Sequence, residues 1–283
     1  IPPVRKSALR QITDKAKYVG PSNLFSQIIP LSMSPSLDDE ERHSLVKLMK
    51  RLLLKLGTEV RPWTHKILVA VTPMLVDEIA YVRIEGRELI SNLSKRVGMP
   101  VMISVLRPDI ESLDESIRTI TAKSLAIVAS SLGVNEFFPF LKAINETKKN
   151  WTIRETGIKV VQQLAMLIGN GVLPYLSMLI EIIKNGLKRE NEHQKVKIHT
   201  ALAISALAEA SYPYGIDFYN EIIKYLFDGI KVYKGKLLAS YFKAIGNIIV
   251  LMEDEVATRS AKNILPILKK DFISPDENIR RVI

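Results

Sequence analysis

The chain has 283 residues, of which 47% are hydrophobic and 25% charged, and it contains no cysteine. This length can bury a large core, as two ordinary domains or as one elongated array. The lack of cysteine excludes disulfides, thiolate zinc sites, iron–sulfur clusters and cysteine nucleophiles. Lys and Arg number 40 against 30 Asp and Glu, a net charge of +10. That excess favours an acidic partner such as nucleic acid.

No apolar run reaches the roughly 18 residues that a membrane span needs. The run Ile67–Val76, for example, is interrupted by Thr72 and Pro73. The N-terminal sequence Ile1–Lys6 has no apolar stretch behind its charges and is unlike a signal peptide. We therefore expect no membrane among the partners.

A short pattern recurs along the chain: an apolar residue followed by Arg or Lys, near the start of a long helical stretch. The basic residues of this pattern, with weaker copies at positions 42 and 236, are Arg5, Arg42, Arg83, Arg118, Arg154, Lys197, Lys236 and Arg280. They are 35 to 44 residues apart. A period in this range is typical of repeats that each contain two helices.

The second helix of each repeat is the clearer one, and in Lys195–Ala210 the apolar and small residues follow helical spacing. Equivalent helices are predicted over Arg118–Leu132, Arg154–Ile168 and Lys236–Leu251. Four glycines near the ends of these helices are expected to form left-handed caps: Gly57, Gly98, Gly133 and Gly169. The first helix of each repeat carries a proline: Pro30, Pro73, Pro108, Pro139, Pro174 and Pro266.

No segment shows the sustained two-residue alternation of a β-strand. The sequence therefore predicts an all-α fold, an α-solenoid of HEAT repeats with about seven to eight helix pairs in a superhelix. We expect residues 1–283 to form a single HEAT-repeat array segment. Because Ile1 and Ile283 both fall inside second helices, we expect this segment to be cut from a longer superhelix.

The sequence offers no catalytic chemistry. Its histidines, His43, His65, His193 and His199, lack a metal-binding spacing. A Gly-rich phosphate loop and a nucleophile elbow are also lacking. We expect no catalytic residue, no metal site and no cofactor, and hence not an enzyme. The acidic run Asp38–Glu41 is expected to complement the positive end of a helix.

The recurring Arg and Lys residues are expected to have a structural role. Each could reach an acid in a turn, such as Asp77, Asp114 or Asp276, and so form a ladder of charge-assisted bonds along the stack. Arg83, Arg118 and Arg280 are the leading candidates for this role.

Five basic residues, including Lys197 of the recurring pattern, are candidates for a ridge that faces RNA or a partner: Lys148, Lys149, Lys159, Lys195 and Lys197. Equivalent positions of stacked repeats lie about 10 Å apart, which suits a phosphodiester backbone. A solvated helix face is the alternative, and Glu146, Glu155 and Glu192 would weaken the field. Aromatic residues such as Trp151 are expected in the core.

Several strings go beyond a generic repeat, including IPPVRK (Ile1–Lys6), EGRELISNL (Glu85–Leu93), TGIKVVQQLA (Thr156–Ala165) and ALAISALAEA (Ala201–Ala210). They resemble the large HEAT-repeat subunit of splicing factor 3b, in the N-terminal half of its array. The resemblance extends over essentially the whole chain. It implies a nuclear, non-enzymatic scaffold of the U2 small nuclear ribonucleoprotein (U2 snRNP), which supports branch-site recognition in pre-mRNA splicing.

The partners that the resemblance implies are the pre-mRNA intron, U2 small nuclear RNA, the other splicing factor 3b subunits and a spliceosomal RNA helicase. Glu115 and Arg118 match the family's acidic–basic pair and are expected to dock a partner, while Lys159 and Lys195 match lysines of its inner surface. Glu155 departs from the family, whose members often have His there. The alternative is a protein-only HEAT scaffold that binds acidic peptides, as in transport receptors or phosphatase scaffolds.

Overall fold

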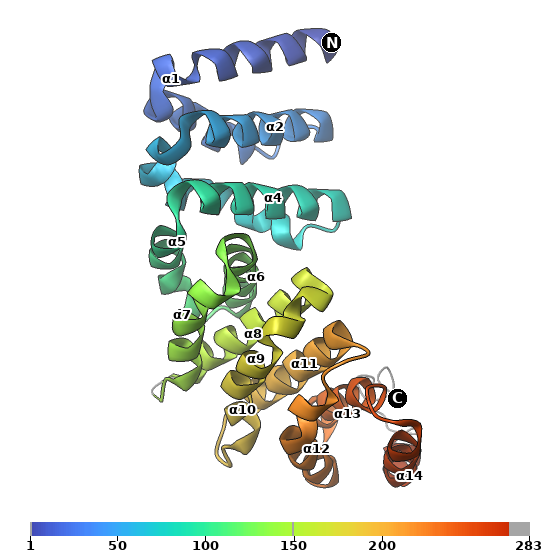
Figure 1. Cartoon of the computed structure of the whole chain (residues 1–283). Helices are drawn as coiled ribbons and strands as arrows, with labels where there is room; N and C mark the ends of the chain where they lie inside the picture. Colours follow the sequence, from blue (N-terminus) through green and yellow to red (C-terminus); the bar gives the residue numbers. More distant parts are fainter. Residues whose placement is uncertain (1, 149, 272–283) are drawn as a thin grey trace. The chain divides into compact units, whose positions relative to one another are not determined.

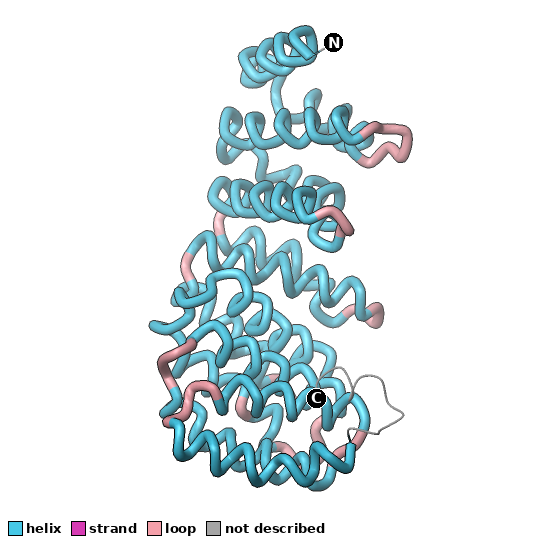
Figure 2. The backbone as a smooth tube through the Cα atoms, turned by 90° about the vertical axis from the view of Figure 1, so that its right-hand side faces the viewer, coloured by secondary structure: helices cyan, strands magenta, loops and turns pink. Residues whose placement is uncertain are grey.

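The computed structural model describes residues 2–148 and 150–271. These residues form helices joined by short loops and contain no strand, which confirms the predicted all-α fold (Figure 2). The chain divides into two compact units, residues 1–109 with 116–133, and residues 110–115 with 134–283.

The helices of the first unit stack in successive rows, which α1, α2 and α4 show in Figure 1. Elements in this part of the chain are α1 (Pro2–Ser32), α2 (Asp39–Leu56), η1 (Gly57–Trp63), α3 (Thr64–Val71), η2 (Thr72–Val76), α4 (Ala80–Val97), α5 (Met99–Leu106), η3 (Arg107–Glu111) and α6 (Glu115–Leu132). Helix α1 is kinked at Gly20, whose φ of 80° and ψ of 155° are not helical. Two helices that meet at this kink therefore occupy the range of α1.

In the second unit α8 packs against α11, and α11 packs against α13 on its other side (Figure 1). The elements here are α7 (Val134–Glu146), α8 (Trp151–Ile168), η4 (Gly169–Tyr175), α9 (Leu176–Ile183), α10 (Asn185–Lys188), α11 (Gln194–Ser211), η5 (Ile216–Tyr219), α12 (Asn220–Val232), α13 (Gly235–Ile249) and α14 (Asp254–Asp271). Fully buried apolar side chains, among them Val161, Leu164, Ile204 and Leu207, fill the contact between α8 and α11.

The predicted second helices are confirmed, but they begin earlier than the recurring basic residue. Helix α8 starts at Trp151, where the side chain of Asn150 accepts a hydrogen bond from the Thr152 amide. Helix α11 starts at Gln194, and His193 Nδ1 accepts from the Lys195 amide. A polar residue that satisfies the free amides decides where each helix starts, so the Arg or Lys lies one turn inside.

The acidic run at the start of α2 has the predicted role. Asp38 caps the helix through a hydrogen bond from the Glu41 amide (2.7 Å), and Glu41 accepts in return from the Asp38 amide. Asp39 and Glu40 also lie in the first turn. Such a reciprocal cap satisfies two amides that the helix itself leaves free.

Glycine ends four helices with a positive φ, as expected, at Gly57 (59°), Gly98 (86°), Gly133 (119°) and Gly169 (52°). The ψ angles of three of them, −126°, 162° and −130°, lie outside the left-handed helical region. The predicted left-handed caps are therefore wrong in detail. The chain leaves these helices in a conformation that is essentially restricted to glycine.

Three of the predicted prolines interrupt the first helices. Pro73, Pro108 and Pro174 lie in the 3₁₀ segments η2, η3 and η4. Proline has no amide hydrogen and crowds the preceding turn, so an α-helix cannot continue through it without distortion. The first helix of these repeats is consequently short and the second one is long.

The helical stretch Trp151–Lys188 contains an 18-residue window that could cross a membrane, judged by its length and composition alone. The sequence there is apolar but interrupted by polar, glycine and proline residues, such as Gln162, Asn170 and Pro174. The stretch is not one helix, since it is divided into α8, η4, α9 and α10. Its apolar residues pack against α11, as in the core of a helix stack.

Several of the recurring basic residues donate to backbone oxygens, while Arg5 and Arg154 also pair with the acids Glu40 and Glu192. Arg83 Nη1 donates to the carbonyl oxygens of Asp77 (2.6 Å) and Glu78 (2.7 Å). Arg154 Nη1 donates to Thr147 O, and Lys197 Nζ to Glu190 O, each at 2.9 Å. The predicted bond from Arg83 to the Asp77 carboxylate is therefore wrong, because the turn carbonyls need donors. Asp276 and Arg280 lie outside the described residues.

Candidate nucleic-acid interface

The starts of α8 and α11 lie side by side. The indole of Trp151 stacks on the imidazole of His193, with ring centroids 3.7 Å apart and an angle of 10° between the planes. Arg154 and Glu192 form a second link between the same two regions. This arrangement brings together residues about 40 positions apart, which is one repeat.

Two of the predicted lysines are exposed at this edge. Lys148 is exposed in the loop before α8, and Lys195 is exposed in the first turn of α11. Lys149 lies outside the described residues. Because these residues lie at or just before the N-terminal ends of α8 and α11, we refer to Lys148, Trp151, His193 and Lys195 as the N-terminal edge.

Lys159 does not contribute an exposed charge to this surface. Its side chain is 6% exposed, and its ammonium lies 3.0 Å from Glu155 Oε1 and 3.4 Å from Glu115 Oε1. The prediction of an exposed ridge is wrong for this residue. The sequence did indicate the reason, because Glu155 precedes Lys159 by one helical turn.

Lys197 is also buried, with 6% of its surface exposed. Its ammonium donates to Glu190 O (2.9 Å) and to the hydroxyl of Tyr233 (3.0 Å), and it lies 5.3 Å from the Tyr233 ring centroid. The RNA-facing position predicted for Lys197 is therefore wrong. The burial of an ammonium requires such partners, so Lys197 belongs with the recurring structural residues.

Glu115 connects three repeats of the sequence through its carboxylate. Oε2 lies 2.6 Å from Lys195 Nζ and Oε1 lies 3.4 Å from Lys159 Nζ. The hydrogen bond from Lys195 lowers the pKa of Glu115, and the charge of Lys159 adds to this effect despite partial burial. Glu155, beyond Lys159, lies 3.3 Å from His199 Nε2. The result is a chain of alternating charges that includes Lys195 of the N-terminal edge.

The predicted docking pair has two different environments. The Glu115 side chain is 47% exposed, whereas Arg118 is 1% exposed. A guanidinium at that depth cannot be reached by a partner without a rearrangement. Glu115 alone therefore remains a docking candidate.

One group of residues has the geometry of a cation site. Ligand atoms of Glu115, Glu155 and His199 all lie within 4.8 Å of one another. The ammonium of Lys159 is already within 3.4 Å of both carboxylates, so it supplies the positive charge that a metal would bring. The arrangement is that of an ion-pair network.

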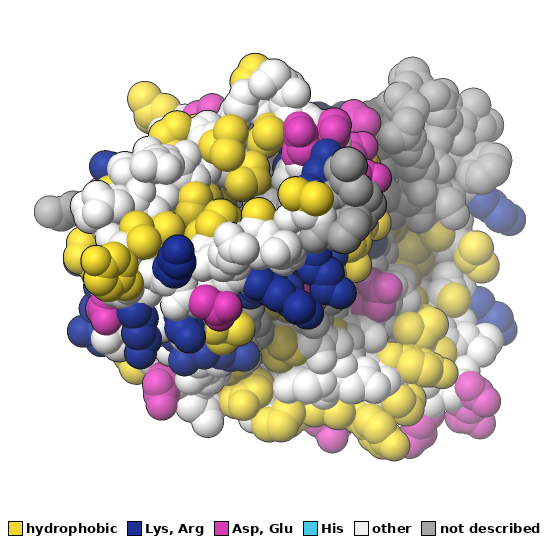
Figure 3. Space-filling model, turned by 90° about the horizontal axis from the view of Figure 1, so that it is seen from above, with side chains coloured by type: hydrophobic (Ala, Val, Ile, Leu, Met, Phe, Trp, Pro, Cys, Tyr) yellow, Lys and Arg dark blue, Asp and Glu magenta, His cyan; other side chains and the backbone are white. Residues whose placement is uncertain are grey.

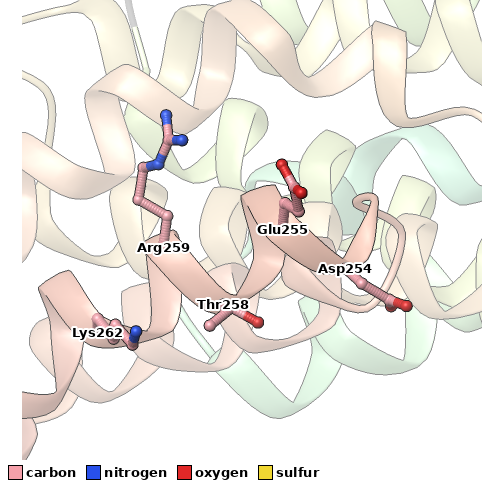
Figure 4. Close-up of a pocket in the computed structure, with 5 residues that line it drawn as sticks. All are labelled: Asp254, Glu255, Thr258, Arg259 and Lys262. Carbon is pink, nitrogen blue, oxygen red and sulfur yellow. The ribbon is translucent and has the colours of Figure 1, made fainter.

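A cavity of about 450 Å³ lies beside α14 (Figure 4). Its described lining is Asp254, Glu255, Thr258, Arg259 and Lys262, all from this one helix. Their side chains point in different directions in Figure 4 and do not converge on a common point. This lining has neither the enclosure nor the convergent polar groups of a typical ligand site.

Sequence reasoning missed the aromatic part of the N-terminal edge. Trp151 was expected in the core, but it is only half-buried and lies at the start of α8. The available signal was its spacing of 42 residues from His193, close to the repeat period, with both residues next to a helix start. Two rings at equivalent positions of adjacent repeats can stack.

No family model matches the chain. Among curated proteins, the chain is 50% identical over 282 residues to the U2 snRNP component prp10 of Schizosaccharomyces pombe. It is 42% identical over 279 residues to the U2 snRNP component HSH155 of Saccharomyces cerevisiae. These matches cover 100% and 99% of the chain, which spans only 23% and 28% of the length of the two relatives.

The fold resembles solved structures of karyopherins at low sequence identity. The structure of Kap121p bound to the SUMO protease Ulp1p matches 96% of this chain and 30% of its own, with a TM-score of 0.56 and 12% identity. A Kap95p structure matches 98% of this chain and 38% of its own, with a TM-score of 0.51 and 14% identity. These likenesses confirm the predicted α-solenoid. The identity to prp10 and HSH155, which extends over the whole chain, confirms the resemblance seen in the motifs.

Proposed function

We propose that this protein is a non-enzymatic scaffold of the U2 snRNP that supports branch-site recognition in pre-mRNA splicing, in the nucleus. The observation that carries the proposal is the 50% identity, over the whole chain, to a protein named as a U2 snRNP component. The absence of catalytic motifs in the sequence is consistent with a scaffold.

The N-terminal edge is the proposed contact for the pre-mRNA intron or U2 small nuclear RNA. Lys148 and Lys195 are exposed there, and Lys149 is adjacent in the sequence. Lysine supplies charge to phosphates without reading bases. The stacked pair of Trp151 and His193 adds a flat aromatic surface on which a base can stack.

Glu115 is the proposed docking point for a protein partner, either another splicing factor 3b subunit or a spliceosomal RNA helicase. Its carboxylate is half exposed and already held in place by Lys195. Exposed ion pairs contribute about 0–1 kcal/mol to stability. We therefore expect Glu115→Ala to reduce helicase or subunit association while the melting temperature changes little. A large fall in melting temperature would instead assign Glu115 a structural role.

The RNA contact is tested in the assembled particle, with the full-length protein carrying Lys148→Gln, Lys149→Gln and Lys195→Gln. If all three lysines neutralise phosphates, the slope of log affinity against log salt should fall by about 2, at about 0.7 for each phosphate on a single strand. The matched control replaces three exposed lysines of α7 and α12 by Gln: Lys142, Lys224 and Lys231. An equal change of slope in both variants would reject the N-terminal edge as the RNA contact.

Nuclease digestion distinguishes the proposed function from the alternative, a protein-only scaffold for acidic peptides. Under our proposal, U2 small nuclear RNA copurifies with the protein, and part of the association is lost after digestion. Partners that all survive digestion, without copurified U2 small nuclear RNA, would favour the protein-only alternative.

A further inference from the structure

A group of three cationic side chains lies in the first unit, whereas the residues of the N-terminal edge belong to the second unit. Arg83 and Arg87 are one turn apart on α4, and Lys123 comes from α6. Arg83 contacts the η2–α4 turn, Arg87 contacts the backbone of Arg83 in the first turn of α4, and Lys123 contacts Leu75 of η2. We call them the Arg83 cluster.

Backbone oxygens hold these side chains in place. Arg83 Nη1 donates to Asp77 O and Glu78 O, and Lys123 Nζ donates to Leu75 O at 3.2 Å. Arg87 Nε donates to Arg83 O at 3.3 Å. The three cations are therefore positioned near one another by neutral acceptors, before any ligand binds.

The charges of the Arg83 cluster are not neutralised by a neighbouring acid. Within the described residues, no carboxylate lies within 4.0 Å of any of the three cationic groups, in contrast to Lys50, Lys159 and Arg154. Of the acids on the adjacent turn, Asp77 uses its Oδ1 to accept from the Ile79 amide, at 2.8 Å. Glu78 is exposed.

Burial and the two neighbouring guanidinium groups both disfavour the charged form of Lys123. Burial lowers the pKa of Lys123, and the positive charges of Arg83 and Arg87 lower it further. Three like charges that are held together without an acid are a typical site for an anion, since binding one removes the repulsion.

The charge of the whole unit indicates the kind of anion. The sequence of the first unit contains 19 Lys and Arg against 11 Asp and Glu, a net charge of +8, whereas the second unit has 21 against 19. Dark blue Lys and Arg side chains gather in groups on the face drawn in Figure 3. An excess spread over a whole unit attracts a polyanion, rather than one isolated phosphate.

We propose that Arg83, Arg87 and Lys123 bind a backbone phosphate of single-stranded RNA. Two guanidinium groups and an ammonium can donate to the non-bridging oxygens of one phosphodiester, which has more acceptor sites than one cation can satisfy. The contact is independent of base identity, so it positions the strand and does not read its sequence. This inference rests on the proposed function, because it requires RNA in the particle.

The decisive variant is Arg87→Glu, in the full-length protein within the assembled particle. Arg87 is exposed, and its hydrogen bond to Arg83 O stays within α4, so the fold should tolerate the change. The new carboxylate would pair with Arg83 and Lys123 and take the place of the phosphate. We expect RNA affinity to fall roughly tenfold, as for the loss of one charged contact, and the melting temperature to stay level or rise.

The matched control is Lys95→Glu, which makes the same type of charge reversal at an exposed position of α4, near its other end. It should lower RNA affinity much less. Ultraviolet crosslinking should also attach nucleotides to the peptides around residues 76–90 and 119–126 of the unaltered protein. These crosslinks should disappear in Arg87→Glu.

Two results would overturn this inference. One is equal RNA affinity and unchanged crosslinks in Arg87→Glu, with U2 small nuclear RNA still copurifying; the proposed function would then stand while the phosphate site fails. The other is the loss of a nuclease-resistant protein partner in Arg87→Glu with RNA crosslinks unchanged, which would assign the cluster to an acidic polypeptide. Absence of U2 small nuclear RNA from every preparation would reject the proposed function itself.

Discussion

Arg154 and Glu192 form a buried, two-pronged ion pair across one repeat. Arg154 Nε lies 2.9 Å from one carboxylate oxygen of Glu192, and Nη2 lies 2.5 Å from the other. The third guanidinium nitrogen donates to Thr147 O. One arginine thereby joins the turn of its own repeat to the turn of the next.

Glu192→Gln should destabilise the protein strongly. The carboxylate is 1% exposed, and its loss leaves a nearly buried guanidinium without a counter-charge. Breaking a buried pair in this way typically costs about 3–5 kcal/mol of the free energy of unfolding. Urea titration should detect the loss. Glu190→Gln, two residues earlier and exposed, is the control and should change stability by less than about 0.5 kcal/mol.

The same pair predicts a dependence of stability on pH. Burial raises the pKa of Glu192, but the hydrogen bonds from Arg154 and the His193 amide outweigh it, and the net pKa lies below 4.5. A lowered pKa in the folded state means that the pair stabilises the protein above about pH 4.5, and that this stabilisation is lost as pH falls below it. The stability difference between the unaltered protein and Glu192→Gln should be constant from pH 7 to 5 and shrink in more acidic solution. A difference that stays constant down to pH 3 would contradict this assignment.

Lys197→Met should affect stability and leave RNA binding unchanged. The change removes the donor to Glu190 O and Tyr233 Oη in a buried place, at a cost of about 1–3 kcal/mol. Thermal unfolding and a salt-dependent RNA titration measure the two effects separately. Weaker RNA binding at an unchanged melting temperature would contradict the structural role and support an RNA contact by Lys197.

Two helical glycines should respond to alanine in opposite ways. A Cβ on Gly186 would lie 2.1 Å from Thr200 Oγ1, so Gly186→Ala should force α10 away from α11 and cost about 1–3 kcal/mol. Gly246 on α13 has nothing within 4 Å of the same position, and Gly246→Ala should stabilise the protein by about 0.5–1 kcal/mol. Equal effects in chemical denaturation would contradict the close packing at Gly186.

The repeat architecture was predictable because it depends on local patterns. Helical spacing of apolar residues, proline in the first helix and glycine at helix ends are each encoded within a few residues, and the structure has the helices where these patterns put them. The predicted helix starts were less accurate, because Asn150 and His193 cap α8 and α11 from positions outside the apolar pattern.

The candidate surface was predictable only in part. Lys148 and Lys195 are exposed as the sequence indicated, but Lys159 and Lys197 are buried by partners from other repeats, such as Glu115 and Tyr233. The local sequence distinguishes them only in part: Glu155 lies one turn before Lys159, whereas the buried Lys197 and the exposed Lys195 are two residues apart near the start of the same helix.

The sequence by itself determined the class of fold, the period of the repeat and the family resemblance, since these are properties of spacing and of strings along one chain. Only the tertiary structure decided which charges are free. An ammonium group is buried and structural where other repeats bring hydrogen-bond acceptors within about 3 Å of it, and it stays exposed where they do not. Those distances arise from the packing of the repeats and not from sequence order.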